Sequence, residues 1–261
     1  FAGAVEAAAS TGGQLMPPVM GAAAFLMAEF VGVPYIDIVK AAVIPALLYF
    51  TGVWLGVHFE AKRSNLKGLP REQLPKMSRL LVERGHLAIP LVVIVYLLVT
   101  GYTPMRAALV AIVLSIICSA LRKSTRMKPI EIVRGLDKGA RNVLSVLVAC
   151  ASAGIVIGVV TKTGVGLKLA SGLLTLSGGM LLPTMFFTMI TAIVLGMGVP
   201  TTANYVITST IAAPAIIQMG VPVLAAHMFV FYFGIIADVT PPVALAAFAG
   251  SGISGGNPLR T

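Results

Sequence analysis

Residues 169–237 contain no Asp, Glu, Lys or Arg, and a soluble domain does not sustain such a stretch. Across the chain, 57% of residues are hydrophobic, 11% are charged, and the mean hydropathy is +0.96. A second uncharged run, residues 142–161, is close to the ~20 residues that cross a bilayer as a helix. Since hydrocarbon leaves no partner for free backbone groups, we predict an all-α polytopic membrane protein.

A Pro-Pro-Val triplet occurs twice inside this apolar sequence, at residues 17–19 and 241–243. The first copy follows a polar and glycine stretch at 11–14, and the second follows Asp-Val-Thr at 238–240. Proline lacks an amide donor and clashes with the preceding turn, so each triplet is expected to stop a helix. Paired interruptions in corresponding positions of two halves indicate the central site of a secondary transporter.

The basic residues indicate the topology. Fourteen of the nineteen Lys and Arg residues fall in two segments, 62–84 and 122–141. Two predicted spans, 87–100 and 107–121, separate these segments and return the chain to the same side of the membrane. The positive-inside rule places both basic segments in the cytoplasm, beside anionic lipid headgroups. The net charge of +10 therefore predicts a multi-pass inner-membrane protein in contact with the lipid bilayer and not with nucleic acid.

The first half of the chain contains one broken helix and one continuous span. A half-helix over residues 1–13 resumes at about 19–30, and a span over 36–58 follows, kinked at Pro45. Apolar residues at helical spacing predict an interfacial amphipathic helix in each basic segment, with Leu74, Met77, Leu80 and Leu81 in the first and Pro129 beginning the second.

The second half is predicted to contain a span at 142–160, an interfacial arm at 162–179 and a helix broken at 238–242. Between the arm and the broken helix, the Gly/Pro/Thr/Asn segment at 196–204 divides residues 182–219 into a re-entrant hairpin. The two broken helices then run in opposite senses, as expected of inverted repeats. We therefore divide the chain into the end of a first repeat (1–58), basic loops around a two-helix scaffold hairpin (59–141) and a second repeat (142–261).

Three segments carry a resemblance to a known family: residues 1–14 (FAGAVEAAASTGGQ), 195–204 (LGMGVPTTAN) and 238–243 (DVTPPV). With them the chain resembles, over essentially its whole length, the large membrane subunit of the tripartite ATP-independent periplasmic (TRAP) transporters. The likeness is strongest to the fused permeases that work with TAXI-class binding proteins. It implies that the chain is the C-terminal part of a longer permease, with a first re-entrant hairpin and a fused small subunit before residue 1.

The resemblance also implies a function. It predicts sodium-coupled uptake of a small organic anion, such as a carboxylate, by an elevator motion, with a periplasmic TAXI-type protein delivering the substrate and a small membrane subunit or its fused equivalent as partner. No cofactor is expected besides the coupling sodium. Two sodium sites are implied where a hairpin tip meets a helix break: Ser10, Thr11, Gly12 and Gly13 at the first, and Gly198, Thr201, Thr202, Asn204, Asp238, Thr240 and Pro241 at the second.

Other interpretations remain open for these residues. Asp238 is the only acid after Asp137, and as an ionisable residue in a membrane helix it suggests function, although it is as well explained by a hydrogen-bonded turn. Thr201, Thr202 and Asn204 are also typical helix caps, and capping is compatible with ion binding. Two other functions are an enzyme using Asp238 as an intramembrane acid or base, and a passive channel or scaffold subunit. The chain lacks the usual nucleophile-base pairs, so we do not expect an enzyme.

Overall fold

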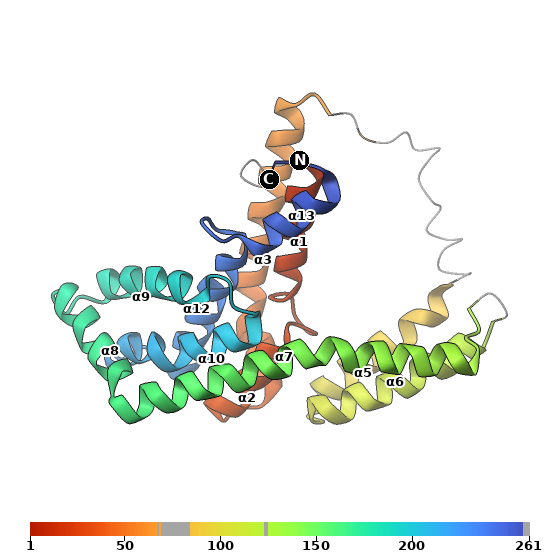
Figure 1. The fold of residues 1–261 in the computed structure, drawn as a ribbon, viewed down its shortest axis with the longest axis horizontal. Coiled ribbons are helices and arrows are strands. Elements are labelled where there is room, and N and C mark those ends of the chain that lie inside the picture. Colours follow the sequence, from red (N-terminus) through yellow and green to blue (C-terminus); the bar gives the residue numbers. More distant parts are fainter. Residues whose placement is uncertain (67, 69–83, 123–124, 258–261) are drawn as a thin grey trace. The chain divides into compact units, whose positions relative to one another are not determined.

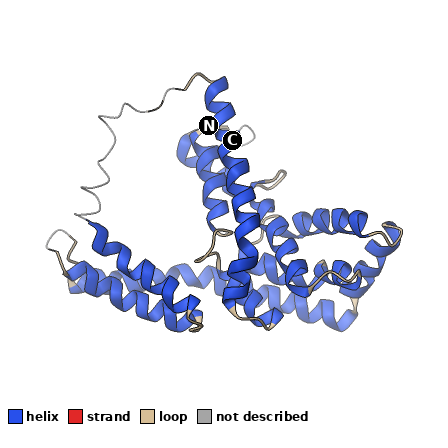
Figure 2. Cartoon of the chain, turned by 180° about the vertical axis from the view of Figure 1, so that it is seen from behind, coloured by secondary structure: helices blue, strands red, loops and turns tan. Residues whose placement is uncertain are grey.

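The structure, a computed structural model, describes residues 1–66, 68, 84–122 and 125–257. The described residues form helices joined by loops, with no strand among them, which confirms the all-α prediction (Figure 2). They divide into two compact units: Phe1–Val33, Asp37–Trp54 and Leu144–Thr261 make the first unit, and Pro34–Ile36 and Leu55–Val143 make the second. The amphipathic helix predicted around Leu74 and Leu81 lies outside the described residues.

The first Pro-Pro-Val triplet separates two short helices, as predicted. Helix α1 spans Ala2–Gly13 and α2 spans Ala22–Val31, and α2 ends at Gly32, whose φ of 72° is a left-handed conformation suited to glycine. Helix α3, Tyr35–Arg63, follows and contains Pro45 in its interior. The chain thus begins with a broken helix followed by one long helix, of which Asp37–Trp54 belongs to the first unit.

The second triplet interrupts another helix in the same way. Helix α12 spans Val223–Ile236, the short 3-10 turn η3 spans Ala237–Val239, and α13 spans Leu245–Ser254. The residue directly after each Pro-Pro-Val triplet has a positive φ, 51° at Met20 and 41° at Ala244. Such a value is uncommon outside glycine, so the two sequence repeats share a distinctive backbone turn.

The halves of the two broken helices pack against each other inside the first unit, α1 on α13 and α2 on α12 (Figure 1). Gly3 lies beside both Gly250 and Ser254 of α13. Ala7, one turn further along α1, lies beside Gly250, one turn further back along α13. Because advancing along α1 means going back along α13, the two helices are antiparallel. This arrangement brings the end of α1 to the beginning of α13, and α1 also contacts η3.

The predicted hairpin lies between these broken helices in sequence. Helix α9, Leu181–Gly196, leads to a short tip, and α10, Thr201–Ile211, returns and packs against it. The returning arm was expected to continue to residue 219, but it is interrupted at Ala212, after which α11 spans Ala213–Gln218. Pro214 lies in the first turn of α11, where its missing amide donor is tolerated, and this explains the interruption.

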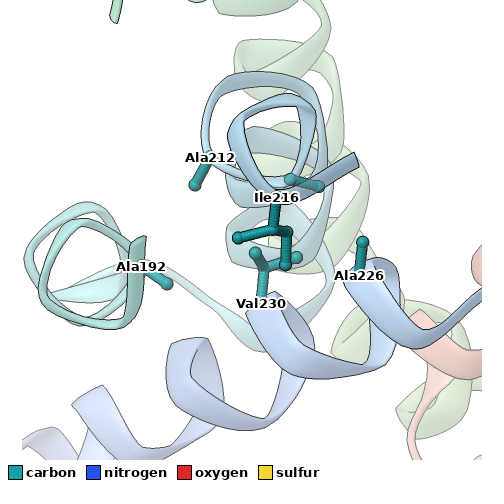
Figure 3. Close-up of a cluster of buried hydrophobic side chains, with 6 residues drawn as sticks. Ala192, Ala212, Ile216, Ala226 and Val230 are labelled. Carbon is teal, nitrogen blue, oxygen red and sulfur yellow. The ribbon is translucent and has the colours of Figure 1, made fainter. Parts of the chain in front are cut away.

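Small side chains allow the hairpin and α12 to approach closely (Figure 3). Ala192 of α9, Ile216 of α11 and Val230 of α12 are fully buried in one cluster, together with Ala212, Ala213 and Ala226. Four of these six buried residues are alanines, and the larger side chains of Met185, Phe229 and Phe233 pack around them. The hairpin is thereby fixed on the first half of the second broken helix.

Helix α7, Pro129–Thr163, is 35 residues long and begins at Pro129, as predicted. It joins the basic segment and the uncharged span 142–160 in one helix, because no proline or tight turn separates them. The left-handed Gly164 then bends the chain by 70° into α8, Val165–Leu176, where the interfacial arm was expected. In the second unit, η2 (Gly85–Ala88) leads into α5, Ile89–Val99, which packs on α6, Pro104–Ala120.

Helix lengths reflect these interruptions. Among the described residues, α3 is long and apolar enough to cross a membrane alone, and the bent pair formed by the end of α7 and α8 is a second candidate. The other apolar helices, including α2, α9 and α12, have between 10 and 17 residues. Both halves of a broken helix must therefore be taken together to reach spanning length.

Candidate functional site

The hairpin tip meets the second break through Asn204, in the first turn of α10. Its side-chain Nδ2 donates a hydrogen bond of 2.7 Å to the carbonyl oxygen of Gly234, near the end of α12. Asn204 is 1% exposed, and its Oδ1 has no hydrogen-bond partner among the described residues. Since buried polar atoms are nearly always satisfied, this oxygen is a candidate ligand for a group that the chain itself does not supply.

Two glycines make room for the Asn204 amide. A Cβ atom on Gly196, at the end of α9, would lie 2.6 Å from Asn204 Nδ2, and one on Gly234 would lie 2.9 Å from Asn204 Oδ1. The Gly196 Cβ would also come within 2.9 Å of the Gly234 carbonyl oxygen. Any larger residue at either position would therefore displace the amide. Helices α9, α10 and α12 can meet at this point because Gly196 and Gly234 have no side chain.

The remaining residues predicted at the second site lie on the hairpin tip or at the second break. The Thr201 side chain lies near the Asp238 carboxyl group, so the tip and the break approach each other at these two residues. The Thr240 hydroxyl donates to the Ile236 carbonyl at 2.6 Å, which leaves its oxygen lone pairs available. Gly198, with a φ of 74°, forms the turn of the tip beside Val243. Thr202 is half-buried, and Pro241 is exposed.

The capping interpretation of the tip residues is wrong. Helix α10 begins at Thr201, its N-cap position is occupied by Pro200, and no side chain caps it. Thr201, Thr202 and Asn204 all lie inside the helix, and none of them makes the capping hydrogen bond. Their oxygens are therefore not used by the start of α10, and Asn204 uses its amide nitrogen on a neighbouring helix instead.

The residues predicted at the first break are not gathered in the same way. Thr11 and Gly12 are buried, and a Cβ on Gly12 would lie 2.5 Å from the Tyr49 ring of α3. The Tyr49 hydroxyl donates to the Ala8 carbonyl at 2.9 Å. Ser10 and Gly13 are exposed, and the Ser10 hydroxyl is 3.4 Å from Glu6 of its own helix. This break is thus held by α3, and no hairpin tip meets it within the described residues.

Sequence reasoning missed a buried polar pair next to Asn204. The Tyr205 hydroxyl and His227 Nδ1 are 2.8 Å apart, joining α10 to α12 a second time. The rings of Phe30 and Phe231 pack against Tyr205 and enclose the pair. A histidine in a charge-free helix was a signal for such a partner, but residue spacing does not reveal which helix supplies it. The pair holds α10 in register with α12.

The chemistry available at the second site is that of neutral and carboxylate oxygens. Asn204, Thr201, Thr240 and Asp238 offer oxygen ligands of the type that a hard cation prefers. Among the described residues no group of three or more His, Cys, Asp or Glu side chains is close enough to hold a metal ion.

Comparison with known protein families gives a match over the whole chain. The family model described as "Tripartite ATP-independent periplasmic transporter, DctM component" matches residues 1–261. No curated protein and no solved structure matches the chain.

Proposed function

The chain belongs to the DctM component family of tripartite ATP-independent periplasmic transporters, and on this premise we propose that it couples sodium to the uptake of a small organic anion. A DctM component is the membrane permease of a system that also contains a periplasmic binding protein and a small membrane subunit. We further propose that the binding protein is of the TAXI type, that the small subunit or its fused equivalent completes the permease, and that the complex lies in the inner membrane.

The observation that carries the sodium proposal is the unpartnered Asn204 Oδ1 at the tip of the hairpin. Leaving such an atom buried costs about 1–3 kcal/mol unless a ligand satisfies it. Thr201 lies in the same first turn of α10 as Asn204, and Asp238 and Thr240 lie at the break that follows α12. Sodium bound by these oxygens would stabilise the contact between tip and break, so loading of the ion and closure of the site would be coupled.

The first break would hold a second sodium ion through Ser10, Thr11, Gly12 and Gly13. This proposal is supported by the turn that the two breaks share after their Pro-Pro-Val triplets and by the antiparallel packing of α1 on α13. Repeats related in this way place their ion sites around one central substrate site. An organic anion can bind there to backbone amides and helix N-termini without a dedicated arginine.

Alternating access by an elevator motion fits the way the hairpin is held. Helix α10 is joined to α12 by the Asn204 and Tyr205 hydrogen bonds, and α9 packs on the same helix. The hairpin and the second broken helix would therefore move as one body. A passive channel needs no such paired breaks, and an intramembrane enzyme would need a base beside Asp238, where the neighbouring side chain is that of Thr201.

Reconstituted transport tests this function. The permease that contains this chain is placed in proteoliposomes with its small subunit, and radiolabelled C4 and C5 carboxylates are supplied with the cognate binding protein. We expect uptake that requires an inward sodium gradient and the binding protein, and that continues without ATP. Uptake that is unchanged when potassium replaces sodium, with the proton gradient also abolished, would exclude ion coupling.

A further inference from the structure

Two buried hydrogen bonds join α10 to α12, and only one of them involves a residue of the proposed ion site. Asn204 Nδ2 donates to the Gly234 carbonyl oxygen at 2.7 Å, and the hydroxyl of the next residue, Tyr205, is 2.8 Å from His227 Nδ1. The two partners lie about two turns apart on α12, or roughly 10 Å along its axis. The bonds therefore hold α10 at two separate points of the same helix.

The bond to Gly234 does not by itself orient the Asn204 side chain. One hydrogen bond fixes the distance between two atoms but lets α10 rotate, and a small rotation would redirect Asn204 Oδ1. The Tyr205 bond opposes this rotation, because it acts on a side chain about 100° further around α10. Oδ1 has no hydrogen-bond partner among the described residues that could hold it in place. Its direction therefore depends on Tyr205, which is not one of the proposed ligands.

The surroundings of Tyr205 make its bond a firm anchor. The ring centroids of Phe30 in α2 and Phe231 in α12 lie 5.9 and 5.8 Å from that of Tyr205. Tyr205 and His227 are both buried, so breaking their bond would leave polar atoms without partners away from water. Residues 169–237 contain no Asp, Glu, Lys or Arg, and no charged side chain of either helix competes for the bond.

We propose that Tyr205 is a positioning residue of the second ion site, whose bond to His227 holds α10 so that Asn204 Oδ1 faces the coupling ion. This inference rests on the proposed sodium function and extends it to a pair outside the ligand set. Residues that orient a ligand tune the affinity for its metal without touching the ion. Loss of the Tyr205 hydroxyl should therefore weaken sodium binding. Excess sodium should restore the maximal rate, because the ion selects the orientation that binds it.

Uptake by the reconstituted permease, measured over a series of sodium concentrations, tests this role. Tyr205→Phe keeps the ring contacts and removes only the hydroxyl, so the sodium half-saturation should rise roughly ten-fold while maximal uptake stays the same. The matched control is Ser209→Ala, which removes another buried hydroxyl of α10, one that donates to the Val206 carbonyl of its own helix. It should keep the wild-type half-saturation. A lower maximal uptake of Tyr205→Phe at an unchanged half-saturation would overturn the proposal, because it would mean only that fewer molecules are active.

Two substitutions of His227 separate the hydrogen bond from packing. His227→Asn keeps a polar atom near the position of Nδ1 and should retain most of the sodium affinity. His227→Leu removes the partner of the Tyr205 hydroxyl and should raise the half-saturation as Tyr205→Phe does. Wild-type half-saturation in both His227→Leu and Tyr205→Phe would contradict a positioning role for the pair.

Combination with Asn204→Ala shows through which residue Tyr205 acts. If Tyr205 works by orienting Asn204, adding Tyr205→Phe to Asn204→Ala should raise the half-saturation no further. A further increase would refute the proposal, since Tyr205 would then affect sodium binding by another route. A shift in Asn204→Ala without one in Tyr205→Phe would refute this inference alone. A wild-type sodium response in Asn204→Ala would refute the inference and the proposed ion site together.

Discussion

The Asn204 side-chain amide occupies the space left by the missing Cβ of Gly234. Nδ2 donates to the Gly234 carbonyl at 2.7 Å, and a Cβ on Gly234 would lie 2.9 Å from Oδ1. The geometry of the second site thus depends on a glycine one turn before the break. Sequence patterns alone gave no reason to single out this residue.

Gly234→Ala should therefore disrupt the site. The new methyl group would displace the Asn204 amide, and overpacking of this kind costs about 1–3 kcal/mol. We expect lower thermal stability and a weaker response of transport to sodium. Gly172→Ala in α8 is the control, since its Cβ would meet no atom within 4 Å. If both variants behave like the wild type, the close packing of Asn204 against Gly234 is wrong.

The crossing of α1 and α13 gives a prediction with a control on the same helix. A Cβ on Gly250 would lie 2.8 Å from the Gly3 carbonyl oxygen, whereas one on Gly252 would touch nothing within 4 Å. Gly250→Ala should reduce both melting temperature and uptake by separating α1 from α13. Gly252→Ala should leave uptake intact and stabilise α13 by roughly 0.5–1 kcal/mol. Equal effects of the two substitutions would refute the antiparallel contact.

The turn after the second Pro-Pro-Val triplet contains Ala244 at a φ of 41°. This conformation costs an L-residue roughly 1–2 kcal/mol, whereas glycine adopts it freely. Ala244→Gly should raise the thermal stability of the permease. Ala247→Gly, inside α13, should lower it by about 1 kcal/mol. Thermal unfolding of both variants, followed by intrinsic fluorescence, measures the difference, and a fall in stability for Ala244→Gly would contradict the observed turn.

Cysteine labelling tests the topology. In a background with Cys118 and Cys150 replaced by alanine, Lys128→Cys should react only from the cytoplasmic side and Lys168→Cys only from outside. Helix α7 separates these positions, and its 35 residues correspond to about 52 Å, longer than the bilayer is thick. Labelling of both positions from the same side would contradict the prediction that the two broken helices cross the membrane in opposite directions.

Much of the fold follows from the sequence because helix-breaking residues act locally. The Pro-Pro-Val triplets, Pro129 and the tip at 196–204 each lie where a helix begins or ends in the structure. Residue spacing did not predict contacts between helices, such as Tyr205 with His227 or Gly3 with Gly250. It also misassigned Thr201 and Asn204 as caps, because Pro200 was not recognised as the residue before the helix. Where a site forms by packing between helices, the residue that each side chain contacts depends on the tertiary structure.

The most direct test of the central claim is a sodium titration of Asn204→Ala beside Thr208→Val. Both residues are buried on α10, but the Thr208 hydroxyl bonds only within its own helix, to the carbonyls of Asn204 and Tyr205. Melting temperature and uptake are measured on each purified variant as sodium replaces potassium. A ligand that binds the folded state raises its melting temperature, so sodium dependence reports on binding.

We predict that both variants lose stability in potassium, and that only Asn204→Ala needs roughly ten-fold or more sodium to reach half-maximal stabilisation and uptake. Thr208→Val should keep the wild-type half-saturation. If Asn204→Ala is less stable but responds to sodium as the wild type does, Asn204 only packs the hairpin against α12, and the second break does not bind the coupling ion through this residue.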